Sequence, residues 1–60
     1  MTSDETIKLL QKDGWTVKRQ NGSHVQLRKE GNPNVITVPH PRKDLSRYVL
    51  MDIKRKAGWK

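Results

Sequence analysis

Two histidines, His24 and His40, are the side chains of this chain best suited to proton transfer near neutral pH. His24 follows a Gly-Ser pair at the head of an alternating apolar and polar segment, so we expect it to be both held and exposed. His40 lies between two prolines, where a rigid loop position explains it better than a chemical role. From spacing alone, an ordinary surface histidine accounts for His24 at least as well as a catalytic one.

The chain is strongly basic, because 13 Lys and Arg oppose six Asp and Glu to give a formal net charge of +7. Such a field concentrates polyanions, and nucleic acid is the leading candidate because binding its phosphates releases condensed counterions. RNA carries its own nucleophile, the 2′-hydroxyl, so a protein that cuts it needs only a proton-transfer group and nearby positive charge. A basic surface that only confers solubility, or that docks an acidic protein, is also compatible with this charge.

Other kinds of site lack the residues they need. There is no Cys, no phosphate-binding glycine loop and no pair of carboxylates at catalytic spacing, and two His are too few to hold zinc. Ser23 has no oriented base and acid around it, so turn formation explains it better than nucleophilic attack. Trp15 and Trp59 lie where helices meet their neighbours, which favours packing over base stacking. We therefore expect no metal and no cofactor.

Sixty residues are expected to form one domain, residues 1–60, which buries only about 60% of the surface that the unfolded chain exposes. No apolar run approaches the roughly 18 residues that cross a bilayer, and the polar, acidic start is unlike a signal peptide. The lack of Cys fits a reducing compartment. We expect a cytoplasmic protein that does not associate with membranes.

Capping signals predict a helix near each end of the chain. Thr2 and Glu5 have the spacing of a capping box, which begins a helix over about 3–13. Ile7 and Leu10 are spaced for one apolar stripe of that helix, and Leu9 widens it. A second apolar stripe predicts a helix over about 46–57, and Gly58 ends it.

Between the helices, alternating residues predict strands over 15–20, 23–29 and 35–38. Asn21-Gly22 is a strong hairpin signal between the first two. The expected fold is therefore α+β with the order α-β-β-β-α, in which two helices cover one face of a three-stranded antiparallel sheet.

The apolar residues predict the register of the first hairpin, because residues that oppose each other in an antiparallel pair share a face. A loop of three residues, 21–23, pairs Val17 with Leu27 and Arg19 with Val25. A two-residue loop at Asn21-Gly22 would mix apolar and polar residues on each face, so we expect the longer loop.

The second hairpin is predicted to turn through residues 30–33, which pairs Leu27 with Ile36 and Val25 with Val38. One face of the sheet then carries the apolar residues Val17, Val25, Leu27, Ile36 and Val38. The other face is polar and basic, with Thr16, Lys18, Gln20, His24, Gln26, Arg28 and Thr37.

The basic residues of this polar face, of the loop before the second helix and of that helix's start are candidate RNA contacts. The predicted set is Lys18, Arg19, Gln26, Arg28, Arg42, Lys43 and Arg47. The register also puts Pro39 opposite His24, which brings His40 to the same end of the sheet. His40 is therefore a candidate second proton-transfer group, ranked below His24.

Four short elements stand out along the chain: Asp13-Gly-Trp15, Arg19-Gln-x-Gly22-Ser-His24, Val38-Pro39 and Ile53-Lys-x-x-Ala57-Gly58. Together they resemble the HicA toxin family, also called YcfA-like, over nearly the whole chain. Many relatives carry a second His directly after the first, whereas this chain has Val25, which the register assigns to the core.

The resemblance implies an mRNA interferase toxin of a type II toxin–antitoxin system, which cleaves mRNA and inhibits growth. It implies an α-β-β-β-α fold similar to the double-stranded RNA-binding domain, with the His of the Gly-Ser-His element, His24, as the catalytic residue. It also implies a HicB antitoxin as partner, which we expect to be acidic and encoded by an adjacent gene. A non-catalytic double-stranded RNA-binding module would share the fold and the charge, but it would not need a His at this position.

Overall fold

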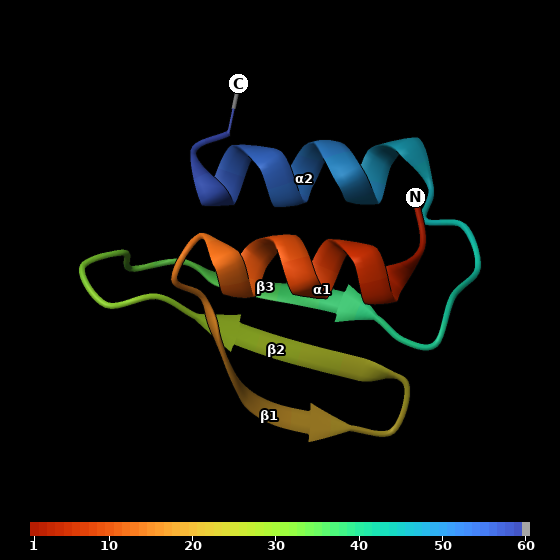
Figure 1. Cartoon of the computed structure of the whole chain (residues 1–60), viewed down its shortest axis with the longest axis horizontal. Coiled ribbons are helices and arrows are strands. Elements are labelled where there is room, and N and C mark those ends of the chain that lie inside the picture. Colours follow the sequence, from red (N-terminus) through yellow and green to blue (C-terminus); the bar gives the residue numbers. More distant parts are fainter. Residues whose placement is uncertain (60) are drawn as a thin grey trace.

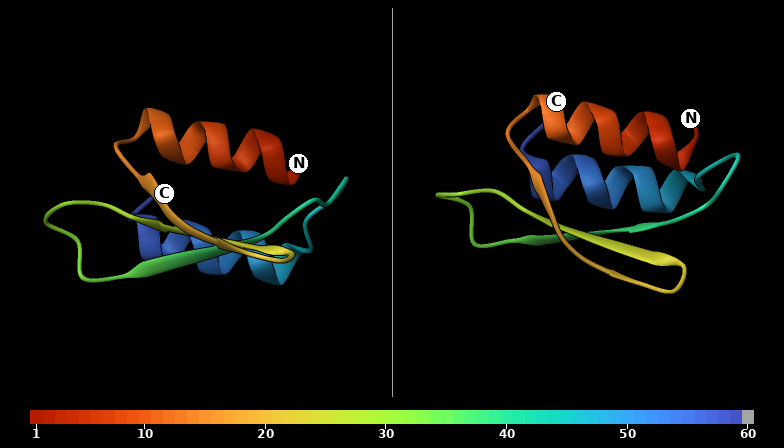
Figure 2. Two further views of the ribbon diagram at one scale, coloured as in Figure 1. Left: turned by 90° about the horizontal axis from the view of Figure 1, so that it is seen from below. Right: turned by 60° about the horizontal axis from the view of Figure 1, so that its bottom comes forward.

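The computed structural model describes residues 1–59 and contains two helices and three strands. In chain order they are α1 (Ser3–Lys12), β1 (Thr16–Asn21), β2 (His24–Arg28), β3 (Val35–Pro39) and α2 (Arg47–Ala57). The strands form one antiparallel sheet in the order β1-β2-β3, and both helices lie on the same side of it (Figures 1 and 2). The predicted fold class is confirmed. No helix within residues 1–59 is long and apolar enough to cross a membrane.

The predicted caps begin and end the helices. The Thr2 hydroxyl accepts the Glu5 backbone N–H, and the Glu5 carboxylate accepts the Thr2 N–H, which lowers the pKa of that carboxyl. Ser46 caps α2 by accepting the Val49 N–H, and Gly58 ends the helix with a left-handed φ of 78°. These local bonds define where both helices begin and where α2 ends.

The core lies between the helices and one face of the sheet. Its buried apolar residues are Leu10, Trp15, Val25, Leu27, Ile36, Val38, Leu45 and Ile53. On α1, Leu9 is 43% exposed rather than part of the apolar stripe, and Thr6 is buried in its place. The Thr6 hydroxyl donates to the Thr2 carbonyl, so its burial leaves no unpaired polar group.

The register of the second hairpin is as predicted. Leu27 pairs with Ile36 and Val25 with Val38, and all four are buried. The same register pairs His24 with Pro39, at the end of the sheet where the crossing loop to α2 begins.

The register of the first hairpin is partly wrong. Val17 does pair with Leu27, but a β-bulge at Lys18 adds one residue to β1, so that Arg19 pairs with Gln26 rather than with Val25. Asn21 then pairs with His24, and the loop has two residues instead of three. The bulge adds one residue to β1 and the loop is one residue shorter. Val17 therefore pairs with Leu27 in both the predicted and the observed register.

The bulge exchanges two side chains between the faces of the sheet. Gln20 pairs with Val25 and so lies on the helix side, not on the polar face as predicted, while Arg19 moves to the polar face beside Gln26. All of β1 remains exposed, and Val17 keeps 36% of its surface accessible, because β1 is the strand farthest from the helices (Figure 1).

Candidate nucleic-acid interface

The sheet surface turned away from the helices, called the open face below, consists of cross-strand rows of residues centred on β2. Its central residues are His24, Gln26 and Arg28, which share a face because side chains alternate along a strand. Each is flanked by one residue of β1 and one of β3. The three rows are Asn21–His24–Pro39, Arg19–Gln26–Thr37 and Thr16–Arg28–Val35.

The open face is positively charged because none of the three strands contains an acidic residue. Within residues 1–59, the ion pairs of Asp13 and Asp52 engage cations outside the strands, and Lys18, Arg19 and Arg28 have no acidic partner. Their charges are therefore available to an anion from solvent.

Lys29, unlike the three strand cations, has an acidic partner. Its ammonium lies 3.5 Å from the Asp13 carboxylate, which also accepts a hydrogen bond of 3.0 Å from the Trp59 indole N–H. The Trp59 bond, and then the charge of Lys29, hold the pKa of Asp13 below its usual range. The carboxylate thus ties the end of α1 to the end of β2 and leaves Lys29 less free than the strand cations.

His24 is the first residue of β2 and is exposed. The turn before it contains Gly22 at φ 58°, the positive value that a two-residue hairpin loop requires at its first position. The turn is anchored by the residue that follows β3, because the His40 backbone N–H donates to the Ser23 carbonyl at 2.7 Å. Among residues 1–59, no protein group forms a hydrogen bond with the His24 ring, so the ring is accessible to a ligand.

The His40 ring extends toward the start of α1. Its Nδ1 lies 2.8 Å from the Ser3 hydroxyl and 3.8 Å from the Asp4 carboxylate, and its side chain is only 24% exposed. The same hydroxyl accepts the Arg42 backbone N–H at 3.0 Å. This is not a hydrolytic triad, because Ser3 is buried and both partners approach the same ring nitrogen. His40 joins the crossing loop to α1 through its ring and supports the His24 turn through its backbone.

The predicted RNA contacts fall into two groups. One group lies on the open face: Lys18, Arg19, Gln26 and Arg28. The other lies in and after the crossing loop, beyond the end of the sheet that carries His24: Arg42, Lys43 and Arg47. The prediction missed Ser3, since no sequence spacing links a residue near the start of the chain to His40.

Within the described residues, no three His, Cys, Asp or Glu side chains gather as a metal site would require.

Comparison with known proteins identifies the family. The model of the family described as "HicA toxin of bacterial toxin-antitoxin" matches residues 3–59. Two solved structures are similar over nearly the full length of both chains. A "HicA3 and HicB3 toxin-antitoxin complex" contains a chain that is 42% identical, with a TM-score of 0.86, 100% of this chain and 97% of that chain being covered. A "Toxin-Antitoxin complex from Streptococcus pneumoniae" contains one that is 37% identical, with a TM-score of 0.81 and 97% of each chain covered. Among curated protein sequences the comparison finds no match. The chain therefore belongs to the HicA toxin family.

Proposed function

We propose that this toxin is a metal-independent endoribonuclease that cuts mRNA on the open face, with His24 as its catalytic residue. The observation that carries the proposal is an exposed histidine at the head of β2 on a face without acidic residues. Cations attract the RNA backbone to this face, and histidine is the side chain best suited to exchanging a proton near neutral pH.

The reaction we propose is transesterification within the RNA. His24 takes the proton of a 2′-hydroxyl, the 2′-oxygen forms a bond to the adjacent phosphorus, and the bond from phosphorus to the 5′-oxygen breaks. The leaving 5′-oxygen then receives a proton from water or from a protonated side chain of the toxin, which gives a 2′,3′-cyclic phosphate and a 5′-hydroxyl end. Arg19 lies one row from His24, where its charge would stabilise the negative charge that grows on the phosphate.

Cleavage of a natural mRNA is expected to continue at an unchanged rate in excess EDTA, because the steps above need only protein side chains, water and the RNA itself. The products, analysed by mass spectrometry, should carry the two ends named above. A matched RNA with a 2′-deoxynucleotide at a mapped cut site should resist cleavage there. Activity lost in EDTA and restored by one divalent ion would contradict the mechanism. RNA that is bound but never cut would instead support a non-catalytic RNA-binding module.

We also propose that a HicB-type antitoxin neutralises the toxin by covering His24 and the cations around it. One similar structure contains a chain of this family together with HicB3. The net charge of +7 favours an acidic partner, since complementary potentials speed association and favour the correct partner.

The exposed His24 ring should react quickly with diethylpyrocarbonate in the free toxin and slowly in a complex purified with the antitoxin encoded beside it. Peptide mapping can follow carbethoxylation at His24, with the half-buried His40 as an internal reference. If His24 in the complex reacted at the rate of the free toxin, inhibition would act away from this residue.

A further inference from the structure

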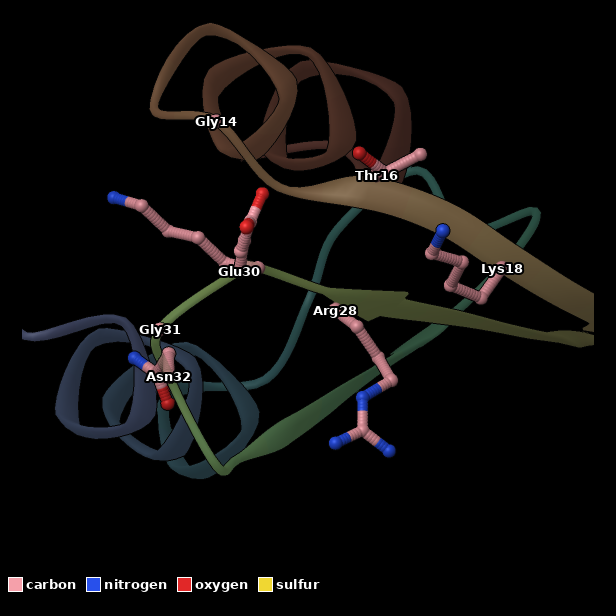
Figure 3. A pocket seen from close by; sticks show the side chains of 8 residues that line it. Gly14, Thr16, Lys18, Arg28, Glu30, Gly31 and Asn32 are labelled. Atoms are coloured by element: carbon pink, nitrogen blue, oxygen red, sulfur yellow. The ribbon is translucent and has the colours of Figure 1, made fainter.

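An open pocket of about 500 Å³ lies at the end of the open face that is farthest from His24. Lys18 of β1, Arg28 of β2, Thr16 and the turn after β2 line it (Figure 3). Its volume falls within the range of about 300–1,000 Å³ that is typical of sites for small organic ligands. The pocket therefore has room for a nucleotide rather than for a phosphate group alone.

The charges around the pocket favour an anion. Lys18 and Arg28 have no acidic partner within residues 1–59, whereas the third cation of the pocket, Lys29, is paired with Asp13. Glu30 is the one acidic residue among the lining side chains. Arginine suits phosphate because its planar fork can donate two parallel hydrogen bonds, and lysine adds a compact charge beside it.

The position of the pocket relative to His24 indicates which anion it holds. Both His24 and Arg28 point to the open face from β2, and the four residue steps from one to the other correspond to about 13 Å along the strand. A stacked nucleic-acid strand advances about 3.4 Å per nucleotide, and an extended strand advances farther, so this distance corresponds to about two to four nucleotides. The row with Arg19 and Gln26 lies between them and offers further donors to the same strand.

We propose that this pocket is a remote RNA subsite that holds the backbone phosphate of a nucleotide about two to four positions from the bond cut at His24, with Arg28 and Lys18 as its ligands. The inference rests on the RNA-cleaving function proposed above. It assigns the long axis of β2 as the path of the RNA strand, with chemistry at one end and an anchoring phosphate at the other.

A phosphate scan tests this path. Short oligoribonucleotides that span a mapped cut site carry a 2′-deoxynucleotide at that site, and each variant replaces one phosphate with a neutral methylphosphonate. Binding to the wild-type toxin is measured by fluorescence anisotropy. We expect neutralisation of one phosphate, about two to four nucleotides from the cut site, to weaken binding about three- to tenfold.

Arg28→Gln should abolish the sensitivity at that phosphate alone, and Lys18→Gln should reduce it. Lys54→Gln, an equal loss of charge on the exposed surface of α2, is the matched control and should keep the wild-type profile. A profile that Arg28→Gln leaves unchanged would overturn the subsite, as would a scan in which no phosphate beyond the cut site matters.

The two proposals fail in different ways. The scan uses RNA that cannot be cut, so its outcome does not depend on catalysis. If His24 cleaves RNA but Arg28→Gln leaves the phosphate scan unchanged, the subsite proposal alone is overturned. A phosphate coupled to Arg28, in a toxin whose His24→Ala variant still cuts at the wild-type rate, would overturn the catalytic role of His24 while still assigning the pocket.

Discussion

His24→Ala is expected to slow RNA cleavage by about 10²- to 10⁴-fold, because a positioned general acid or base typically contributes that much to a proton-transfer step. The side chain is exposed and bonds to no described protein group, so its removal opens no cavity and should change the free energy of unfolding by at most about 0.5 kcal/mol. Digestion of one mRNA by both proteins measures the loss, and thermal unfolding checks the fold. A folded variant that cuts at the wild-type rate would remove His24 from the mechanism.

His40→Gln is the matched control for this experiment, since it removes the second histidine and keeps a side chain that can hydrogen-bond to the Ser3 hydroxyl. A cleavage rate within about threefold of wild type would leave His24 as the sole catalytic histidine. A loss of about 10²-fold in a folded His40→Gln variant would assign a proton-transfer step to His40 as well.

Leu27→Ala should have the largest effect on stability, about 2–5 kcal/mol, because it leaves a cavity in the core beneath the open face. The whole domain has only about 3–9 kcal/mol of stability to lose, at the usual value per residue for 60 residues. A large fraction of the variant should therefore be unfolded at 37 °C.

Val17→Ala is the control, since Val17 faces Leu27 across the strands but remains 36% exposed. We expect it to cost less than about 1 kcal/mol, because little of its surface leaves water on folding. Urea unfolding of both variants gives the comparison. Equal losses would mean that β1 is covered in solution, in contrast to the structure.

The sequence predicted the parts of the fold that depend on local signals or on two matching apolar patterns. The capping box of Thr2 and Glu5 satisfies backbone groups within one turn, so its residues suffice to locate the start of α1. The pairing of β2 with β3 follows from apolar residues on both strands, since only one alignment buries them together.

The bulge at Lys18 could not be predicted in this way. Pairing Val17 with Leu27 is compatible either with a three-residue loop or with a bulge and a two-residue loop, and the apolar pattern is the same in both. Only the residues nearer the turn differ, and because β1 is exposed throughout, burial imposes no choice between them. For the candidate site, this error misplaced Arg19 and Gln20 but not His24.

The environment of the His40 ring could not be predicted from the sequence either. Its register position follows from Pro39 pairing with His24, but the direction of its ring depends on the buried Ser3 hydroxyl, which comes from the opposite end of the chain. Contacts of this kind arise from how the crossing loop meets α1, and no periodic pattern encodes them.

The extra residue in β1 makes the two strands of the first hairpin unequal in their tolerance of changes in length. Deletion of Lys18 would leave every pair of the register in place, because Lys18 has no partner on β2. Deletion of Gln26 would instead move Val25 and His24 to the opposite faces of the sheet, since side chains alternate along a strand. Among related toxins, single-residue insertions and deletions in this hairpin should therefore accumulate in β1 and be selected against in β2.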